Sequence, residues 1–347
     1  MKPRDILQNS WKKRGVLACL MLLPAGVFFL LAALRRIAYR RGWLRSEKLA
    51  VPVVVIGNIT VGGSGKTPLT LWLAQRLQQS GRHPGIVSRG YGGCNDAGTI
   101  TIREVTAESL AQEVGDEPVL LKRRSGLPLF VGSNRVAAAR ALLAAYPECD
   151  LLICDDGLQH YRLARDVEIA VLDERGLLNG WPLPAGPLRE PAARLGGVDA
   201  LVLNGDAASA LGGKPAFRMQ LVGSTFYRLD EPQQACDAAA LTPLRLAAIA
   251  GIGVPERFFE HLEKLGLKFS RHIFPDHHHY LPDDFLAIHA DALLMTEKDA
   301  VKCAGFGKQT IWVLPVSAQV APSSSGVDLA AHVEHCIEEK LLGCPPA

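Results

Sequence analysis

The sequence lacks the patterns that mark a zinc-bound or disulfide-stapled protein. Its eight cysteines form no CxxC pair and no cysteine–histidine grouping with zinc-ligand spacing, so we expect reduced thiols in a cytosolic compartment. An excess of one charge is also missing, because 38 Lys and Arg stand against 35 Asp and Glu. This balance gives no support to a nucleic-acid partner. No repeat or long low-complexity stretch appears, and the apolar content excludes wholesale disorder.

Charge is also absent from a long run near the N-terminus, Val16 to Leu34. About 19 residues of helix rise roughly 28 Å, close to the hydrocarbon thickness of a bilayer. A spanning helix, an interfacial helix, a cleavable signal peptide and a buried core helix are the competing interpretations. Pro24, Gly26 and the Lys and Arg residues on both flanks favour an interfacial or shallowly inserted anchor. The nucleotide site predicted downstream argues against export.

A phosphate-binding loop follows a short β-branched run at 53–56, which predicts a buried parallel strand. The loop is Gly57-Asn58-Ile59-Thr60-Val61-Gly62-Gly63-Ser64-Gly65-Lys66-Thr67-Pro68, and an apolar helical pattern comes after it. Gly62, Gly63, Ser64 and Gly65 let backbone N–H groups surround phosphate oxygens at a helix N-terminus. Lys66 would reach the β- and γ-phosphates of ATP, and the Thr67 hydroxyl would ligate Mg²⁺.

One position departs from the usual GxxxxGK[ST] pattern, because Thr60 stands where the first glycine is expected. Gly62 and Gly63 supply the backbone freedom two positions later. A glycine-rich turn without a ligand does not explain why Lys66 and Thr67 follow Gly65 at a strand-to-helix junction. We therefore interpret the loop as a nucleotide site.

A second apolar run at 151–154 ends in Asp155-Asp156-Gly157-Leu158-Gln159-His160. Carboxylates at the C-terminal end of a parallel strand point into the crevice where ligands bind, so Asp156 or Asp155 would hold Mg²⁺. A turn or a helix N-cap is the other interpretation of this pair.

Two further polar positions have both a functional and a structural interpretation. Asp116 precedes a helical stretch and is either an N-cap or a carboxylate that accepts a proton from an acceptor hydroxyl. The cluster His277-His278-His279 cannot converge on one metal, because adjacent side chains diverge. A surface loop and a single functional histidine remain open there.

Together these segments resemble one family, the tetraacyldisaccharide 4'-kinases of lipid A biosynthesis. The resemblance covers nearly the whole chain, including the N-terminal apolar segment. Besides the loop at 57–68 and the segment at 155–160, it is carried by Ser88-Arg89-Gly90-Tyr91-Gly92, Gly115-Asp116-Glu117-Pro118, Leu183-Pro184-Ala185-Gly186-Pro187-Leu188-Arg189-Glu190-Pro191, Phe274-Pro275-Asp276-His277 and Thr296-Glu297-Lys298-Asp299-Ala300-Val301-Lys302.

The resemblance implies transfer of the γ-phosphate of ATP to the 4'-hydroxyl of a tetraacylated glucosamine disaccharide 1-phosphate. It implies that Asp116 is the catalytic carboxylate, that His277 orients it, with His278 and His279 as alternatives, and that Lys66 acts on the phosphates. It places Thr67 and Asp156 at Mg²⁺. On the acceptor side it implies Arg135, Gln159, His160 and Glu190.

The expected architecture is α/β. We predict a membrane anchor over 1–45, a P-loop domain with a doubly wound, mostly parallel sheet over 46–225, and a smaller α/β domain over 226–347 that closes over the cleft. The resemblance implies the cytoplasmic face of the bacterial inner membrane, with a lipid-linked disaccharide and the membrane surface as partners. Nothing in the sequence indicates an obligate protein partner. A P-loop switch or metal-insertion protein, and a membrane-associated module that senses ATP, are the rival functions.

Overall fold

The chain folds into two compact units, each assembled from separate stretches of sequence. The computed structural model describes residues 9–91, 93, 101–205, 214–303, 306 and 309–343. Unit 1 comprises Met1–Ser88, Asn134–Gln220 and Gln319–Ala347, and unit 2 comprises Arg89–Ser133 and Leu221–Ala318. This division differs from the continuous domains that we predicted. Residues 89–133 belong with the second unit, and the C-terminal segment returns to the first.

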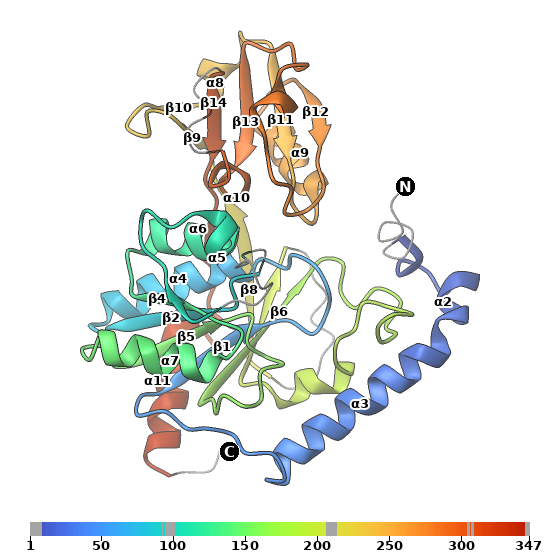
Figure 1. Ribbon diagram of the computed structural model, residues 1–347, viewed down its shortest axis with the longest axis vertical. Helices are drawn as coiled ribbons and strands as arrows, with labels where there is room; N and C mark the ends of the chain where they lie inside the picture. The colour runs from blue at the N-terminus through green and yellow to red at the C-terminus, as the bar shows by residue number, and fades with distance from the viewer. Residues whose placement is uncertain are drawn as a thin grey trace. The chain divides into compact units, whose positions relative to one another are not determined.

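A sheet forms the centre of unit 1, and its strands there run in the order β15-β8-β7-β6-β1-β5-β2 (Figure 1). The central strand β1 (Val53–Gly57) is buried along its whole length and pairs in parallel with β5 and β6. Its β-branched residues suit a strand that is covered on both faces. The other strands are β2 (Pro84–Ser88), β5 (Leu151–Asp155), β6 (Val167–Asp173), β7 (Ala200–Asn204), β8 (Ala216–Val222) and β15 (Ser317–Val320).

Helices cover this sheet with apolar faces. Helix α4 (Lys66–Gln79) buries Leu69, Leu73 and Leu77, which share one face at a spacing of four residues, against β1, β2 and β5. Helix α11 (Leu329–Leu341) begins at Asp328, whose carboxylate accepts a hydrogen bond from Ala330 N, and it packs on α4 and β6. That packing explains why the C-terminal segment belongs to unit 1. The remaining helices of the sheet region are α7 (Arg135–Ala145) and the 3₁₀ helix η1 (Ala192–Gly197).

The uncharged N-terminal run forms two helices, α2 (Val16–Leu20) and α3 (Leu22–Arg40), which join at Met21. Pro24 therefore lies in the first turn of α3, where a missing N–H breaks no helical hydrogen bond. Helix α3 is long and apolar enough to cross a membrane, and little of it is buried against the protein. The interpretation as a buried core helix is wrong.

Unit 2 contains a second sheet with the strand order β10-β9-β14-β13-β11-β12 (Figure 1). Strands β11 (Leu246–Ala250), β12 (Phe269–Ile273), β13 (Ala292–Thr296) and β14 (Ile311–Leu314) are parallel, which agrees with the expected α/β class. At one edge, β9 (Thr225–Arg228) and β10 (Ala235–Asp237) add antiparallel strands. The short strands β3 (Arg103–Glu104) and β4 (Leu129–Val131) pair antiparallel elsewhere in the unit.

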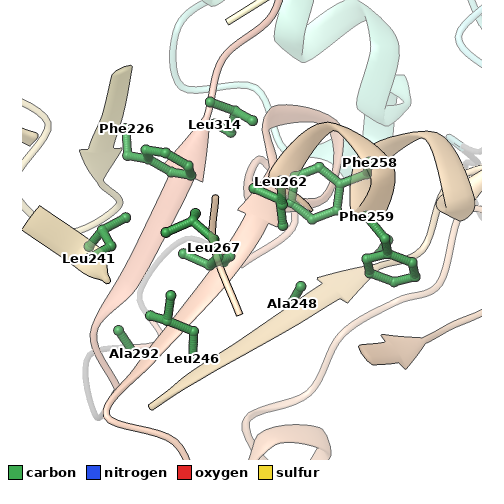
Figure 2. Packing of buried hydrophobic residues seen from close by; sticks show 12 residues of the cluster. Phe226, Leu241, Leu246, Ala248, Phe258, Phe259, Leu262, Leu267, Ala292 and Leu314 are labelled. Carbon is green, nitrogen blue, oxygen red and sulfur yellow. The ribbon is translucent and has the colours of Figure 1, made fainter. Parts of the chain in front are cut away.

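An aromatic and aliphatic core holds unit 2 together (Figure 2). Phe258, Phe259 and Leu262 of helix α9 pack on the strands, and Phe226 and Leu314 fill the opposite part of the cluster. The unit's helices are α5 (Ala111–Val114), α6 (Asp116–Ser125), α8 (Ala238–Leu241), α9 (Pro255–Lys264), α10 (Glu297–Ala300) and the 3₁₀ helix η2 (Pro282–Phe285). Helices α6 and α10 contact each other. This contact brings together the polar side chains described below.

Candidate active site

The predicted phosphate-binding loop connects β1 to α4 in unit 1 and is braced by two buried asparagines. Asn58 donates its side-chain N–H groups to Ser64 Oγ at 3.1 Å and to Gly62 O at 3.2 Å. Asn204, at the end of β7, donates to Ser64 O at 3.0 Å. Its amide lies so close that a Cβ on Gly65 would meet Asn204 Nδ2 at 2.6 Å. Positive φ angles of 108° at Gly62 and 94° at Gly65 also require glycine.

The structure explains why a threonine is tolerated at position 60. Thr60 forms an antiparallel bridge with Leu188, and Val61 N donates to Pro187 O at 3.0 Å. The backbone there pairs with a neighbouring segment before the loop turns at Gly62. A side chain at position 60 therefore does not hinder the turn.

Lys66 begins α4 and points its ammonium group at the acidic strand end. Its Nζ lies 3.4 Å from Asp156 Oδ1, and Arg189 Nη1 lies 3.4 Å from Asp156 Oδ2. Burial alone would raise the pKa of Asp156, but the charges of Lys66 and Arg189 outweigh it and hold that pKa below its usual range. Asp156 has a φ of 50°, a costly conformation for a residue other than glycine. The neighbouring Asp155 accepts a hydrogen bond from Thr70 Oγ1 at 3.0 Å.

The residues predicted for the acceptor side lie after β5 and in the segment before η1. Gln159 Nε2 donates to Asn58 O at 3.0 Å and to Glu190 Oε2 at 3.3 Å, so it links the phosphate-binding loop to Glu190. Glu190 is buried, accepts a hydrogen bond from Tyr161 and lies 3.8 Å from Arg194. Two of the four predicted residues thus meet in one network.

The other two predicted residues, Arg135 and His160, interact through charge. Arg135 is the first residue of α7 and is buried. Burial and the nearby charges of Arg135 and Arg165 lower the pKa of His160 to about 4. His160 is therefore neutral at physiological pH.

The membrane-anchor candidate contacts the same network. Arg35 of α3 donates to Gln159 O at 3.3 Å, and the rings of Tyr39 and Tyr161 lie 5.9 Å apart. Upstream, the buried Trp11 donates its Nε1–H to Pro184 O at 2.9 Å. The N-terminal helices are thus tied to the segments that carry Gln159 and Glu190.

Asp116 and His277 meet within unit 2. His277 Nδ1 lies 2.9 Å from Asp116 Oδ2 and 3.1 Å from Asp116 Oδ1, and the Tyr91 ring lies 5.0 Å from the imidazole. His278 contacts Asp284 and His279 contacts Gln112, so the histidine that reaches Asp116 is His277. Asp116 is the first residue of α6 rather than its N-cap, which is Gly115.

The electrostatic setting keeps Asp116 ionised. Burial would raise the pKa of Asp116, but the hydrogen bond with His277 and the charge of Lys298 hold that pKa below its usual range. Beside the pair lies a cavity of about 500 Å³, with Asp116, His277 and Lys302 among its polar lining and Leu110, Pro282 and Val301 among its apolar lining. A carboxylate with a histidine at one side of a cavity is suited to accept a proton from a bound hydroxyl group.

The glycine pair Gly251 and Gly253, after β11, is not arranged around an open phosphate site. The Gly251 N–H donates to Asp299 Oδ2 at 3.0 Å, and a Cβ on Gly251 would meet Tyr280 OH at 2.6 Å. The buried Asp299 carboxylate therefore takes the place that a phosphate oxygen would have in a nucleotide loop. The pair therefore forms a tight turn after β11.

Comparison with known proteins decides the family. The model of the Tetraacyldisaccharide-1-P 4'-kinase family matches residues 17–334. The chain belongs to this family. Among curated members, the tetraacyldisaccharide 4'-kinase of Dechloromonas aromatica is 52% identical over 342 residues and covers 97% of both chains. That of Methylobacillus flagellatus is also 52% identical, over 87% of this chain and 88% of its own.

A solved structure supports the fold. The tetraacyldisaccharide 4'-kinase of Aquifex aeolicus, crystallised with ATP, is 28% identical and has a TM-score of 0.79, covering 93% of this chain and 100% of its own. The expected class of a P-loop α/β protein with a second α/β unit is confirmed.

Sequence reasoning missed two charged residues of this tetraacyldisaccharide 4'-kinase family member. Arg189 contacts Asp156. Lys298 Nζ lies 3.1 Å from Glu117 Oε1 and 4.0 Å from Asp116 Oδ2. Both belong to segments that carried the resemblance, but a motif alone does not reveal which side chain turns toward a site. Gly92 of another such segment lies outside the described residues.

Proposed function

We infer that the chain is an ATP-dependent kinase that transfers the γ-phosphate to the 4'-hydroxyl of a tetraacylated glucosamine disaccharide 1-phosphate. Family membership over residues 17–334 is the observation that carries this conclusion. The two polar centres support it, since phosphoryl transfer needs both a phosphate site and a group that orients the acceptor hydroxyl. In the reaction, the acceptor oxygen bonds to the γ-phosphorus, the bond to the β–γ bridging oxygen breaks, and ADP leaves.

The unit 1 centre is suited to hold ATP. Backbone N–H groups of Gly62, Gly63, Ser64 and Gly65 would bind phosphate oxygens, and Lys66 would offset the charge that moves toward the leaving oxygen. Arg189, 3.4 Å from Asp156, adds a second cation beside that position.

The donors around Lys66 also fit Mg²⁺, because Thr67 and Asp156 offer the hard oxygen ligands that this ion takes along with phosphate oxygens. Asp156 Oδ1 is buried and lies 3.4 Å from the Lys66 ammonium group. Bound there, Mg²⁺ would neutralise negative charge on the phosphates.

The unit 2 centre is suited to the acceptor. Asp116 would orient the 4'-hydroxyl and accept its proton late in a loose transition state, and His277 would fix the carboxylate. The cavity of about 500 Å³ beside them is large enough for a sugar ring and its substituents. Arg135, Gln159, His160 and Glu190 are proposed to contact the acceptor lipid.

The N-terminal helices are proposed to hold the enzyme where its water-insoluble acceptor resides. Leu23, Leu30 and Leu31 of α3 are exposed by 82%, 58% and 62%, as expected of a helix that contacts lipid. Arg35 then lies at the polar end of that helix, beside Gln159. Because ATP is cytosolic, we propose the cytoplasmic face of the inner membrane.

Acceptor-dependent ADP formation tests this function against the P-loop switch. Purified full-length protein in mixed micelles is incubated with ATP and Mg²⁺, with the disaccharide lipid or with a lipid of equal acyl content and no sugar. ADP formed only with the disaccharide supports the kinase. ADP formed equally with both lipids would establish the switch, and the family assignment would then not extend to activity.

A further inference from the structure

Lys298 is a nearly buried cation surrounded by carboxylates. Its Nζ lies 3.1 Å from Glu117 Oε1, 3.6 Å from Asp276 Oδ1 and 4.0 Å from Asp116 Oδ2. The side chain is 20% exposed. Its partners come from two segments, the start of α6 and the loop that ends in His277. The ammonium group therefore bridges the two segments whose side chains form the Asp116–His277 pair.

Asp116 shares the Lys298 ammonium group with two other carboxylates. Glu117 and Asp276 lie around the same ammonium group as Asp116, and negative charges gathered at one site favour the protonated form of a carboxylate. A protonated Asp116 could not accept a proton from a substrate hydroxyl. Burial would lower the pKa of Lys298, but Glu117, Asp116 and Asp276 outweigh it and raise that pKa, so the ammonium group remains charged.

The backbone that carries Lys298 is fixed on both sides. Glu297 pairs with Arg124 of α6 at 2.7 Å. Asp299 accepts hydrogen bonds from Thr296 Oγ1 at 2.8 Å and from Gly251 N at 3.0 Å. The loop before His277 is bound to the same turn after β11, because His277 N donates to Gly251 O at 3.2 Å. These contacts of the short helix α10 fix the backbone that places Lys298 beside Asp116.

We propose that Lys298 is a positioning residue for phosphoryl transfer, holding α6 and the His277 loop together and offsetting the negative charge gathered around Asp116. The proposal rests on the proposed kinase function. Lys298 acts through Asp116 and makes no required contact with ATP. Among the described residues, the other charged or titratable groups around the pair are Glu117, Asp276, Lys302 and Tyr91, with the Glu297–Arg124 ion pair behind them.

The pH dependence of turnover in full-length Lys298→Met tests the proposal. Without the cation, Asp116 protonates more readily, so the acid limb of the kcat profile should move to higher pH. We expect a fall of about threefold near pH 5, a smaller fall above pH 7 and an unchanged KM for ATP. Lys298→Arg should restore most of the loss. Lys264→Met, which removes an exposed lysine of α9, should match the wild type.

Glu117→Gln provides a test in the opposite direction and does not depend on whether Lys298→Met folds. It removes a negative charge beside Asp116, so its acid limb should move to lower pH. A loss in Lys298→Met that is equal at every pH, a raised KM for ATP, or Lys298→Met and Glu117→Gln profiles that match the wild type would each overturn the proposal. If the wild type itself phosphorylates no lipid, the proposed function fails instead.

Discussion

Asp116 and His277 are 161 positions apart in the sequence, yet one ring nitrogen of His277 lies within hydrogen-bonding distance of both carboxylate oxygens of Asp116. When two residues act as one unit, substituting either one removes the catalytic contribution of both. Asp116→Asn and His277→Ala should each lower kcat at least about 10²-fold, and the double variant should be little worse than the poorer single.

Three measurements on the same variants decide between a paired and a structural role. ATP affinity and melting temperature should stay near the wild-type values while kcat falls. Losses that multiply in the double variant would contradict the pair. A loss of stability of about 1 kcal/mol with turnover spared would instead indicate that Asp116 has only a structural role in the first turn of α6.

The lowered pKa of His160 predicts that the stability of the folded protein depends on pH. Burial and nearby arginines lower its pKa to about 4 in the folded protein, against an ordinary value of 6.5. The unfolded chain therefore binds the proton first, and stability that is present above pH 6.5 is lost as the pH falls toward 4. His160→Gln should lose less melting temperature than the wild type between pH 7 and pH 5. Equal losses would show that His160 is protonated in the folded state.

Helix α3 is predicted to bind the membrane through its exposed leucines. Deleting residues 1–40 would also remove the buried Trp11 and uncover its contact at Pro184. Substitution of exposed leucines is the cleaner test. Leu23→Ser/Leu30→Ser/Leu31→Ser should lower the membrane-bound fraction, because each leucine contributes about 1.5–3 kcal/mol when fully buried in an apolar medium.

The matched control for α3 uses Leu341 and Leu342, which are exposed by 64% and 81% at the end of α11. Leu341→Ser/Leu342→Ser should leave sedimentation with vesicles unchanged. Both variants should keep the KM for ATP of the wild type. If the protein with the three α3 leucines changed to serine still sediments fully with vesicles in high salt, another surface anchors it.

Elements set by local sequence were predictable, and those set by distant contacts were less so. The strand at 53–57, the glycine loop and the helix at 66–79 follow from neighbouring residues. The sequence did not predict that the apolar run divides into two helices at Met21. Pro24 and Gly26 were expected to interrupt the run, but Pro24 lies in the first turn of α3, where proline is tolerated. Lys298 received no role because its partners come from α6 and from the loop at 276, and no local pattern joins them.

At the scale of the whole molecule, chain order misled the assignment of domains. The chain leaves unit 1 after Ser88, returns at Asn134, leaves again after Gln220 and returns at Gln319. The P-loop centre therefore lies in one unit and Asp116 in the other, although both precede residue 120. For that reason the predicted role of Asp116 depended on the family resemblance rather than on its place in the sequence.

The position of the transferred phosphate on the lipid tests the proposed kinase function. The full-length protein is incubated with ATP, Mg²⁺ and the disaccharide lipid, and the product is examined by mass spectrometry and phosphorus–proton correlation NMR. We predict one added phosphoryl group on the 4'-oxygen. The rate should be at least about 10²-fold lower for Lys66→Ala and unchanged for Lys264→Ala. ADP without a phosphorylated lipid, or a phosphate on any other oxygen, would contradict the account.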